Sequence, residues 1–192
     1  MGYIYFVMGK SSSGKDTIYK KMMEDKSFDF KTLVGYTTRP MRQGEENGKE
    51  YFFVTEEEMN RLNEAGKVIE SRCYNTVYGD WYYFTASDGQ VDLEKNNYLL
   101  IGTLESYAKV RQYYGKDVVR PIYIEVEDGK RLMRAINREM QQETPKYEEM
   151  CRRFIADCKD FAEEKILECG IKKRYINNDI ESCILEIKRD II

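Results

Sequence analysis

The sequence predicts an α/β protein in which helices cover both faces of a parallel sheet. Two observations lead to this prediction. Apolar runs of the length of buried strands recur along the chain, at 3–8, 98–102, 118–126 and 172–176. Stretches with helical periodicity lie between and after them, at 15–26, 104–114, 128–139, 146–169 and 180–190. Strands that alternate with helices of this length are typical of a three-layer architecture.

Composition limits the possible partners. The 192 residues suffice for one domain with its own core, and 42% are hydrophobic and 34% charged. A net charge of −3 argues against a general nucleic-acid or membrane-binding surface. No apolar stretch approaches the ~18 residues that span a bilayer, and the first residues lack a signal-peptide layout. We therefore expect a cytoplasmic protein, monomer or homodimer, with no nucleic-acid or membrane partner.

Cysteine and histidine usage excludes further classes. The five cysteines are odd in number and form no C-x-x-C pair, which favours reduced thiols in the cytosol. The chain has no histidine, so Ser-His-Asp and Cys-His catalysis within it are excluded, as are histidine-bound metals.

Residues 31–84 interrupt the alternation of strands and helices. They contain four short β-like pieces, KTLVGY, YFFV, KVIESRCY and DWYYFT, around one helix. That helix, 55–66, begins with a capping box from Thr55 to Glu58 and ends at Gly66. The pattern predicts a small mixed sheet inserted after the first helix, within a single domain.

The stretch 146–169 is predicted as one long helix with an apolar face. That face comprises Tyr147, Cys151, Phe154, Cys158, Phe161 and Leu167. On this pattern Cys151 and Cys158 are expected to pack in the core rather than to bind a metal.

The segment 9–17, GKSSSGKDT, follows the apolar run YIYFVM and has the phosphate-loop spacing G-x-x-x-x-G-K at Gly9, Gly14 and Lys15. A strand before the loop and a helix after it supply the required context. Backbone N–H groups and the helix N-terminus would face the phosphates, and Lys15 would reach their outer oxygens. The alternative is a Gly/Ser-rich turn that only starts a helix. The predicted ATP-binding residues here are Gly9, Lys10, Ser11, Ser12, Ser13, Gly14, Lys15, Asp16 and Thr17.

Asp16 occupies the position that normally carries a Ser or Thr hydroxyl bound to Mg²⁺. A carboxylate at a helix start suits the helix dipole and is also an oxygen ligand for Mg²⁺, directly or through water. Our hypothesis is that Asp16 makes nucleotide binding more strictly dependent on Mg²⁺, with Thr17 still offering a hydroxyl one place later.

A second motif lies at 36–54, YTTRPMRQGEENGKEYFFV. Arg39 and Arg42 are three residues apart, Pro40 stiffens the loop between them, and Tyr51 follows a turn. Two guanidinium groups and a phenol can surround a phosphate dianion with bidentate geometry. The alternative is a solvated basic loop beside an unrelated hairpin.

Together the two motifs resemble the guanylate kinase family of P-loop nucleoside monophosphate kinases, whose acceptor segment reads T-T-R-x-x-R-x-G-E-x-x-G-x-x-Y-x-F-V. Every fixed place is met, from Thr37 to Val54. The similarity continues through VIESRCYNTVYG at 68–79 and YINND at 175–179, and it covers nearly the whole chain. It implies a P-loop NTPase fold with a core of 1–30, 98–133 and 154–192, an acceptor-binding insertion at 31–84 and a helical lid at 134–153.

The resemblance also implies roles for matching residues. The acceptor phosphate would be held by Arg39, Arg42, Tyr51 and Tyr78, with Gly79 and Asp80 beside them. Glu70 would accept hydrogen bonds from guanine N1–H and the exocyclic amine. The catalytic groups would be Lys15, Arg134, Arg138 and Arg153, which spread the charge of the transferring phosphoryl group. Asn177 would border the donor adenine. The choice between Arg152 and Arg153 stays open because the lid segment before them is long.

The chain departs from the family around the base. The family usually has a Ser at the position of Gly35, a Ser or Thr at Asp80 and a base-facing Asp at Thr103. Of the base-reading set only Glu70 matches, so guanine selectivity is predicted less firmly than phosphoryl transfer.

The predicted activity is Mg²⁺-dependent transfer of the γ-phosphate of ATP to a nucleoside monophosphate, with GMP as the favoured acceptor. One alternative is a kinase for another phosphomonoester, such as ribose 1,5-bisphosphate, although Glu70 would then have no base edge to read. The other is a binding module without catalysis, against which the presence of Lys15 and the lid arginines argues.

Overall fold

The computed structural model describes residues 1–42, 44–76 and 79–192. Its main sheet has five parallel strands in the order β2-β7-β1-β8-β9. These strands are β1 (Ile4–Met8), β2 (Phe30–Thr32), β7 (Asn97–Gly102), β8 (Val119–Glu125) and β9 (Tyr175–Ile176). The helices associated with them are α1 (Lys15–Glu24), α3 (Leu104–Tyr114), α4 (Asp128–Met140), α5 (Tyr147–Asp160), α6 (Glu163–Glu168) and α7 (Ile180–Ile191).

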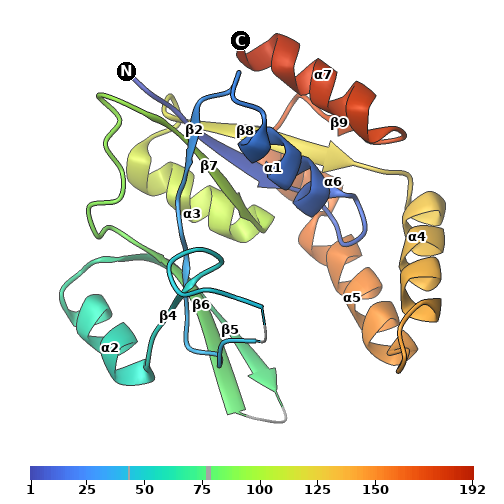
Figure 1. Ribbon diagram of the computed structural model, residues 1–192, viewed down its shortest axis with the longest axis horizontal. Coiled ribbons are helices and arrows are strands. Elements are labelled where there is room, and N and C mark those ends of the chain that lie inside the picture. Colours follow the sequence, from blue (N-terminus) through green and yellow to red (C-terminus); the bar gives the residue numbers. More distant parts are fainter. Residues whose placement is uncertain (43, 77–78) are drawn as a thin grey trace.

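The alternation of side chains along β1 explains the layers. Ile4, Phe6 and Met8 join a core that contains residues of α3 and α6. Tyr5 and Val7 point the other way, into a second core with residues of α1 and α7. Figure 1 shows the sheet between these two layers of helices. The predicted three-layer α/β sandwich is therefore confirmed.

The inserted sheet has the strand order β4-β3-β6-β5 and mixes parallel and antiparallel pairs, as predicted. Its elements are β3 (Tyr36–Thr37), β4 (Phe52–Phe53), β5 (Val68–Thr76), β6 (Gly79–Ala86) and the adjoining helix α2 (Glu56–Glu64). The predicted capping box of α2, from Thr55 to Glu58, is present in both directions. In Figure 1 this unit and the α4–α5 pair project from the main sheet as two separate arms.

The two faces of the inserted sheet differ in chemistry. On one face the ring of Tyr36 packs against Phe52 and Phe84, with centroids 4.9 and 5.0 Å apart. On the other face Tyr83 stands opposite both Thr37 and Arg72 in the strand register. This second face, which we call the acceptor face, carries Glu70, Arg72 and Tyr74 of β5 with Tyr83 and Thr85 of β6.

The prediction of one helix over 146–169 is wrong. The chain breaks between α5 and α6, where Ala162 is extended with φ −61° and ψ 146°. The break lets Phe161 turn into the core and stack on Tyr123 at 5.9 Å. Cys151 and Cys158 are exposed, so their predicted core packing is also wrong.

Two boundaries in the main sheet differ from those expected. Lys31 and Thr32 were assigned to the insertion, but they pair with β7 at the edge of the main sheet. The strand predicted at 172–176 is reduced to two residues, because the chain pairs with β8 only at Tyr175 and Ile176. No helix in the described ranges combines the length and the apolar character of a membrane-spanning segment.

Candidate active site

The candidate residues gather at one edge of the main sheet. Because its strands are parallel, their carboxyl ends share an edge, where the loops of an open α/β sheet form a binding crevice. The loop 9–14 leaves β1 there, and Thr103, Glu127 and Asn177 follow β7, β8 and β9. Four segments distant in sequence thus meet at one place.

The backbone of the phosphate loop has a conformation that requires glycine at position 14. Gly14 has φ 85°, and a Cβ atom at this position would lie 2.4 Å from Nδ2 of Asn177. That amide is fully buried and donates a 2.7 Å hydrogen bond to the carbonyl of Ser13. Asn177 therefore holds the loop in shape. The expectation that its side chain borders an adenine does not fit this burial.

The polar side chains of the phosphate loop differ in whether they have a partner. Lys10 forms an ion pair with Asp128 at 3.1 Å. The hydroxyls of Ser12 and Ser13 are buried and have no hydrogen-bond partner among the described residues. Ser12 also has φ 62°. Buried polar groups without partners are rare, and here they lie in a loop whose sequence pattern predicts phosphate oxygens as ligands.

Lys15 and Asp16 start α1, and Nζ of Lys15 lies 3.3 Å from Oδ2 of Asp16. The side chain of Asp16 is 76% exposed, and the adjacent Thr17 is exposed too. These oxygens are the type that Mg²⁺ prefers, but the described residues hold no cluster of three or more acidic, cysteine or histidine ligands. The residues therefore fit a metal held mainly by nucleotide phosphates, with Asp16 as a protein contact.

The tip of the loop is tied to the helical arm. Asp157 on α5 accepts a 2.9 Å hydrogen bond from the backbone N–H of Ser11 and a 3.0 Å bond from Arg131 on α4. Arg131, which is 1% exposed, also donates to the carbonyl of Ser11 at 3.2 Å and stacks over Phe154. One buried ion pair thus joins both arm helices to the phosphate loop.

The predicted lid arginines reach this edge to different extents. Arg134 donates to the carbonyl of Asn177 at 2.9 Å, and Arg153 donates to the hydroxyl of Ser11 at 3.2 Å. Arg138 is half exposed and lies 3.5 Å from Glu139. With Arg153 and Ser12 it lines a small pocket beside the loop tip.

The structure separates Arg152 from Arg153. Arg152 forms two hydrogen bonds with Glu149, at 2.6 and 2.7 Å, away from the loop. Its pKa is raised, chiefly by Glu149 and to a smaller extent by Tyr74 of the inserted sheet. Arg153 is therefore the better candidate for the donor side, whereas Arg152 is exposed and paired with Glu149 on its own helix.

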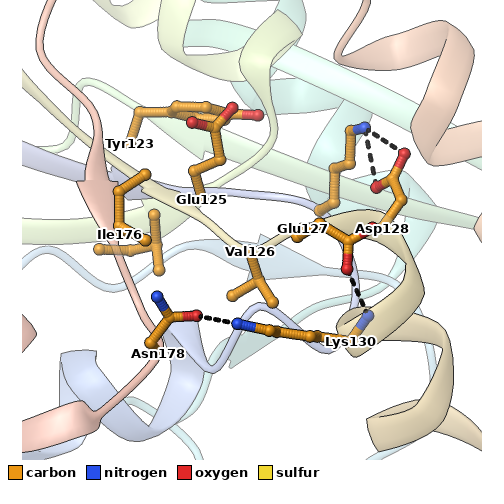
Figure 2. Close-up of a pocket in the computed structure, with 10 residues that line it drawn as sticks. Tyr123, Glu125, Val126, Glu127, Asp128, Lys130, Ile176 and Asn178 are labelled. Atoms are coloured by element: carbon orange, nitrogen blue, oxygen red, sulfur yellow. Dashed lines mark hydrogen bonds and ion pairs between the residues drawn. The ribbon is translucent and has the colours of Figure 1, made fainter.

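A cavity of about 540 Å³ lies beside the phosphate loop, a volume ordinary for a small-molecule site. It opens between the ends of β8 and β9 and the start of α4, and Figure 2 shows the side chains around it. Lys10 and Asp128 pair on one side, and Lys130 donates to Asn178 on the other at 2.9 Å. Asn178, rather than Asn177, is the asparagine that lines this cavity.

Arg39 is buried on the acceptor side and already has an anionic partner. It donates two hydrogen bonds to Glu45, at 2.7 and 2.5 Å, and its Nε donates to Tyr83 at 3.1 Å. Its guanidinium also lies 5.5 Å from the ring of Tyr51. Hydrogen bonding from Arg39 lowers the pKa of Glu45 to about 2. We call the residues predicted to hold the acceptor phosphate, Arg39, Arg42, Tyr51 and Tyr78, the phosphate clamp. Its first member, Arg39, is already bound to a carboxylate of the chain, Glu45.

Arg42 and Tyr51 complete the described part of the clamp. The Arg42 backbone N–H donates to Glu45 at 2.8 Å, and its side chain is exposed. Burial raises the pKa of Tyr51, with Tyr83 and Asp16 adding to the rise and Arg72 and Arg39 opposing it. The phenol of Tyr51 thus stands among charged groups of the acceptor side, beside Arg39.

Glu70, predicted as the reader of the base, is 3% exposed on β5. Its Oε1 accepts a 2.8 Å hydrogen bond from Thr85, and its Oε2 lies 3.2 Å from Nε of Arg72. The second contact is an ion pair whose arginine side chain is 20% exposed. Glu70 is therefore already held by two neighbours on the acceptor face.

Other predicted acceptor residues lie elsewhere or have other partners. Asp80 pairs with Asn75 on the opposite face of the sheet, at 2.8 Å, so it does not join Glu70. Thr103 caps α3 by exchanging hydrogen bonds with Ser106. Gly79 is exposed at the start of β6, and Tyr78 lies outside the described residues. A Cβ at Gly35 would meet only ordinary contacts with Tyr51 and Phe84.

Sequence reasoning did not single out several residues that matter here. Arg72 could have been found, because it lies two places after Glu70 in a predicted strand and so shares its face. Glu45 lay within the recognised motif but had no role assigned. Arg131 and Asp157 carried no local signal, because their partners lie over a hundred residues away in the loop.

Comparisons with known proteins agree with this geometry. The family model described as guanylate kinase matches residues 2–189. The chain is 31% identical to a guanylate kinase of Homo sapiens over 94% of this chain and 87% of that protein. It is 30% identical to a guanylate kinase of Caldanaerobacter subterraneus over 100% of this chain and 87% of that protein. The crystal structure of guanylate kinase from Anaplasma phagocytophilum gives a TM-score of 0.62 at 26% identity, over 99% of this chain and 84% of that one.

Proposed function

The chain belongs to the guanylate kinase family, and from that premise we propose that it transfers the γ-phosphate of ATP to GMP, giving ADP and GDP. The observation that carries the proposal is the match to the guanylate kinase family model over residues 2–189, which spans both the phosphate loop and the segment that holds Arg39, Arg42 and Tyr51. A donor phosphate and an acceptor phosphate held at these two places would face each other.

The donor triphosphate would bind the loop 9–15, with its outer oxygens near Lys15 and the lid arginines. The unpartnered hydroxyls of Ser12 and Ser13 support this assignment, because phosphate oxygens would give them partners. The nucleoside would occupy the cavity beside Lys10, where Asn178 and Lys130 supply polar contacts. Arg134 would border it, since its guanidinium lies on the Asn177 carbonyl.

The acceptor phosphate would bind Arg42, Tyr51 and Arg39, with Arg39 exchanging one of its present partners for the phosphate, and the base would approach Glu70. Phosphoryl transfer between two phosphates needs no general base, because the attacking oxygen is already anionic. What the chain supplies is alignment of the two substrates and positive charge around the transferring group. Arg138 and Arg153 would supply that charge from the arm, whose closure would also exclude water.

We assign Mg²⁺ as the metal that accompanies ATP. Asp16 would help to hold it, and its charge would offset the repulsion between this carboxylate and the donor nucleotide. We also assign the protein to the cytoplasm, since all five cysteines are free thiols.

A coupled assay of ADP release tests the proposal. The wild-type chain and Lys15→Met are assayed with ATP, Mg²⁺ and one acceptor at a time, from GMP, dGMP, AMP, CMP, UMP and ribose 1,5-bisphosphate. We expect the highest kcat/KM with a guanine nucleotide and loss of turnover in Lys15→Met. Highest turnover with the sugar phosphate would replace the acceptor assignment, and no turnover with any acceptor would leave a binding module.

A further inference from the structure

The ion pair between Glu70 and Arg72 has a consequence for base recognition. Both side chains stand on the acceptor face, because they are two residues apart on β5. Nε of Arg72 lies 3.2 Å from Oε2 of Glu70, and its terminal nitrogen Nη2 lies 3.5 Å from Oε1. Thr85 donates to the same Oε1 at 2.8 Å. Glu70 is thus approached by three protein donors before any base arrives.

A carboxylate offers about four lone-pair directions for hydrogen bonds. The three donors from Arg72 and Thr85 direct hydrogens at three of them, which leaves one for a ligand. Guanine presents two donors on this edge, N1–H and the exocyclic amine. Both cannot be accepted while Arg72 stays in place, so one donor of guanine has no partner on Glu70.

The pairing also changes the cost of binding the wrong base. A buried carboxylate without a partner is strongly unfavourable, and that penalty is what lets such a site reject a base lacking a donor. Here Glu70 keeps Arg72 and Thr85 as partners whichever base binds. The penalty, and the discrimination that follows from it, is therefore reduced.

We propose that Arg72 is a specificity-determining residue, which limits Glu70 to one hydrogen bond with the purine and so admits hypoxanthine nearly as well as guanine. This assignment rests on the proposed function, since it concerns the acceptor of that same reaction. It names inosine monophosphate (IMP), a purine nucleotide without the exocyclic amine, as a second substrate.

The test is the ratio of kcat/KM for GMP to that for IMP, measured at saturating ATP and Mg²⁺. IMP differs from GMP only in the missing amine, so any effect of Arg72 on the phosphate cancels in the ratio. We expect a ratio within about threefold of unity for the wild type. In Arg72→Ala the second acceptor site of Glu70 becomes free for the amine, and the ratio should rise by about tenfold or more.

Three further variants control the measurement. Arg72→Met keeps much of the side-chain volume without the donors, so it should repeat the result if the alanine variant folds poorly. Arg72→Lys restores a charged donor and should return the ratio toward the wild-type value. Arg61→Ala removes an exposed arginine of α2 in the same insertion and should leave the ratio unchanged. Thermal unfolding identifies which variants are folded.

The possible outcomes distinguish failure of the role assigned to Arg72 from failure of the proposed kinase function. A wild-type ratio already above about tenfold, or equal ratios in the wild type and both neutral Arg72 variants, would overturn the role of Arg72 while leaving the kinase intact. If the wild type phosphorylates neither GMP nor IMP, the proposed function fails and the role of Arg72 fails with it.

Discussion

The two substrate regions of this protein are built in different ways. The phosphate loop takes its shape from one continuous segment, and backbone carbonyl and N–H groups make most of its anchoring contacts, to Asn177, Asp157 and Arg131. On the acceptor side the key charged groups come from the inserted sheet and the loop after β3, and they are paired with each other, Arg39 with Glu45 and Glu70 with Arg72. The donor side is a preformed backbone cradle, whereas the acceptor side is a set of internal ion pairs.

This difference predicts how each region responds to change. A backbone cradle keeps its shape when one side chain is removed, so a substitution there should act on the phosphate that the side chain touches. In a network of ion pairs, removal of one member leaves a charge without its partner, so a substitution alters both binding and stability. The experiments below test this contrast, from the largest expected effect to the smallest.

Lys15→Met should lower kcat by about a thousandfold or more, because one partly buried cation near the transferring phosphoryl group supplies several kcal/mol of transition-state stabilisation. The melting temperature should change little, since among the described residues the ion-pair partner of Lys15 is the exposed carboxylate of Asp16. Steady-state kinetics and calorimetry measure the two quantities. Lys20→Met, exposed on the same helix, is the matched control, and a large stability loss in Lys15→Met would contradict the picture of a rigid cradle.

Arg42→Ala should lower kcat/KM for the acceptor by about a hundredfold, since it removes a charged partner of the acceptor phosphate. The KM for ATP should stay within about threefold, because the donor loop does not depend on this side chain. Kinetics at varied GMP and varied ATP separate the effects, with Arg61→Ala as the control on the same arm. Near-normal acceptor kinetics would remove Arg42 from the clamp.

Asp157→Asn should raise the KM for ATP by about tenfold. It should also lower the melting temperature by about 4–8 °C, as expected for the loss of ~2 kcal/mol in a chain of this size. The carboxylate joins Arg131 to the loop tip, so this donor-side contact is an ion pair of the kind that holds the acceptor side. Asp160→Asn, exposed on the same helix, should change neither quantity. An unchanged melting temperature would show that the tether contributes nothing to the fold.

The same contrast explains what could be predicted from the sequence. The layers, the mixed insertion and the loop 9–15 could be predicted, because the periodicity of apolar residues and the spacing of the motif are visible within short stretches of sequence. The break after α5 could not be predicted, since it depends on Phe161 reaching Tyr123, thirty-eight positions earlier. The contact of Asn177 with the loop was not predicted, because its partner Ser13 lies 164 positions earlier. The helix cap formed by Thr103 and Ser106 is local, and the sequence analysis did not single it out.

Asp16→Ser tests the metal contact of the donor loop. The half-saturating Mg²⁺ concentration should change by about three- to tenfold, because a carboxylate and a hydroxyl differ in their charge toward the metal and the phosphates. Turnover at saturating Mg²⁺ should change less. Titration of activity with Mg²⁺ at fixed ATP measures both, and Glu24→Ser at the far end of α1 is the control. Identical Mg²⁺ dependence in Asp16→Ser and the wild type would remove Asp16 from the metal site.

The smallest effect that we expect is a loss of stability at low pH that depends on Glu45 on the acceptor side. Arg39 lowers the pKa of Glu45 from 4.5 to about 2 in the folded chain. Because the folded pKa is the lower one, this carboxylate stabilises the fold above pH ~4.5, and the contribution is lost as the pH falls toward about 2. Glu45→Gln keeps an oxygen for Arg39 but cannot ionise, so it should melt about 2–4 °C below the wild type at pH 7, for a loss of ~1 kcal/mol.

The difference in melting temperature between the wild type and Glu45→Gln should narrow steadily as the pH is lowered from 4.5 toward the folded-state pKa of Glu45, about 2. Melting curves between pH 7 and pH 3 measure it. Glu46→Gln provides the comparison, since Glu46 is an exposed carboxylate 3.8 Å from Lys49 and should show no gap at any pH. A gap that stayed constant with pH would mean that Glu45 acts through its shape and hydrogen bonding alone. The acceptor side would then be stabilised in the same way as the donor loop, and the contrast between the two regions would disappear.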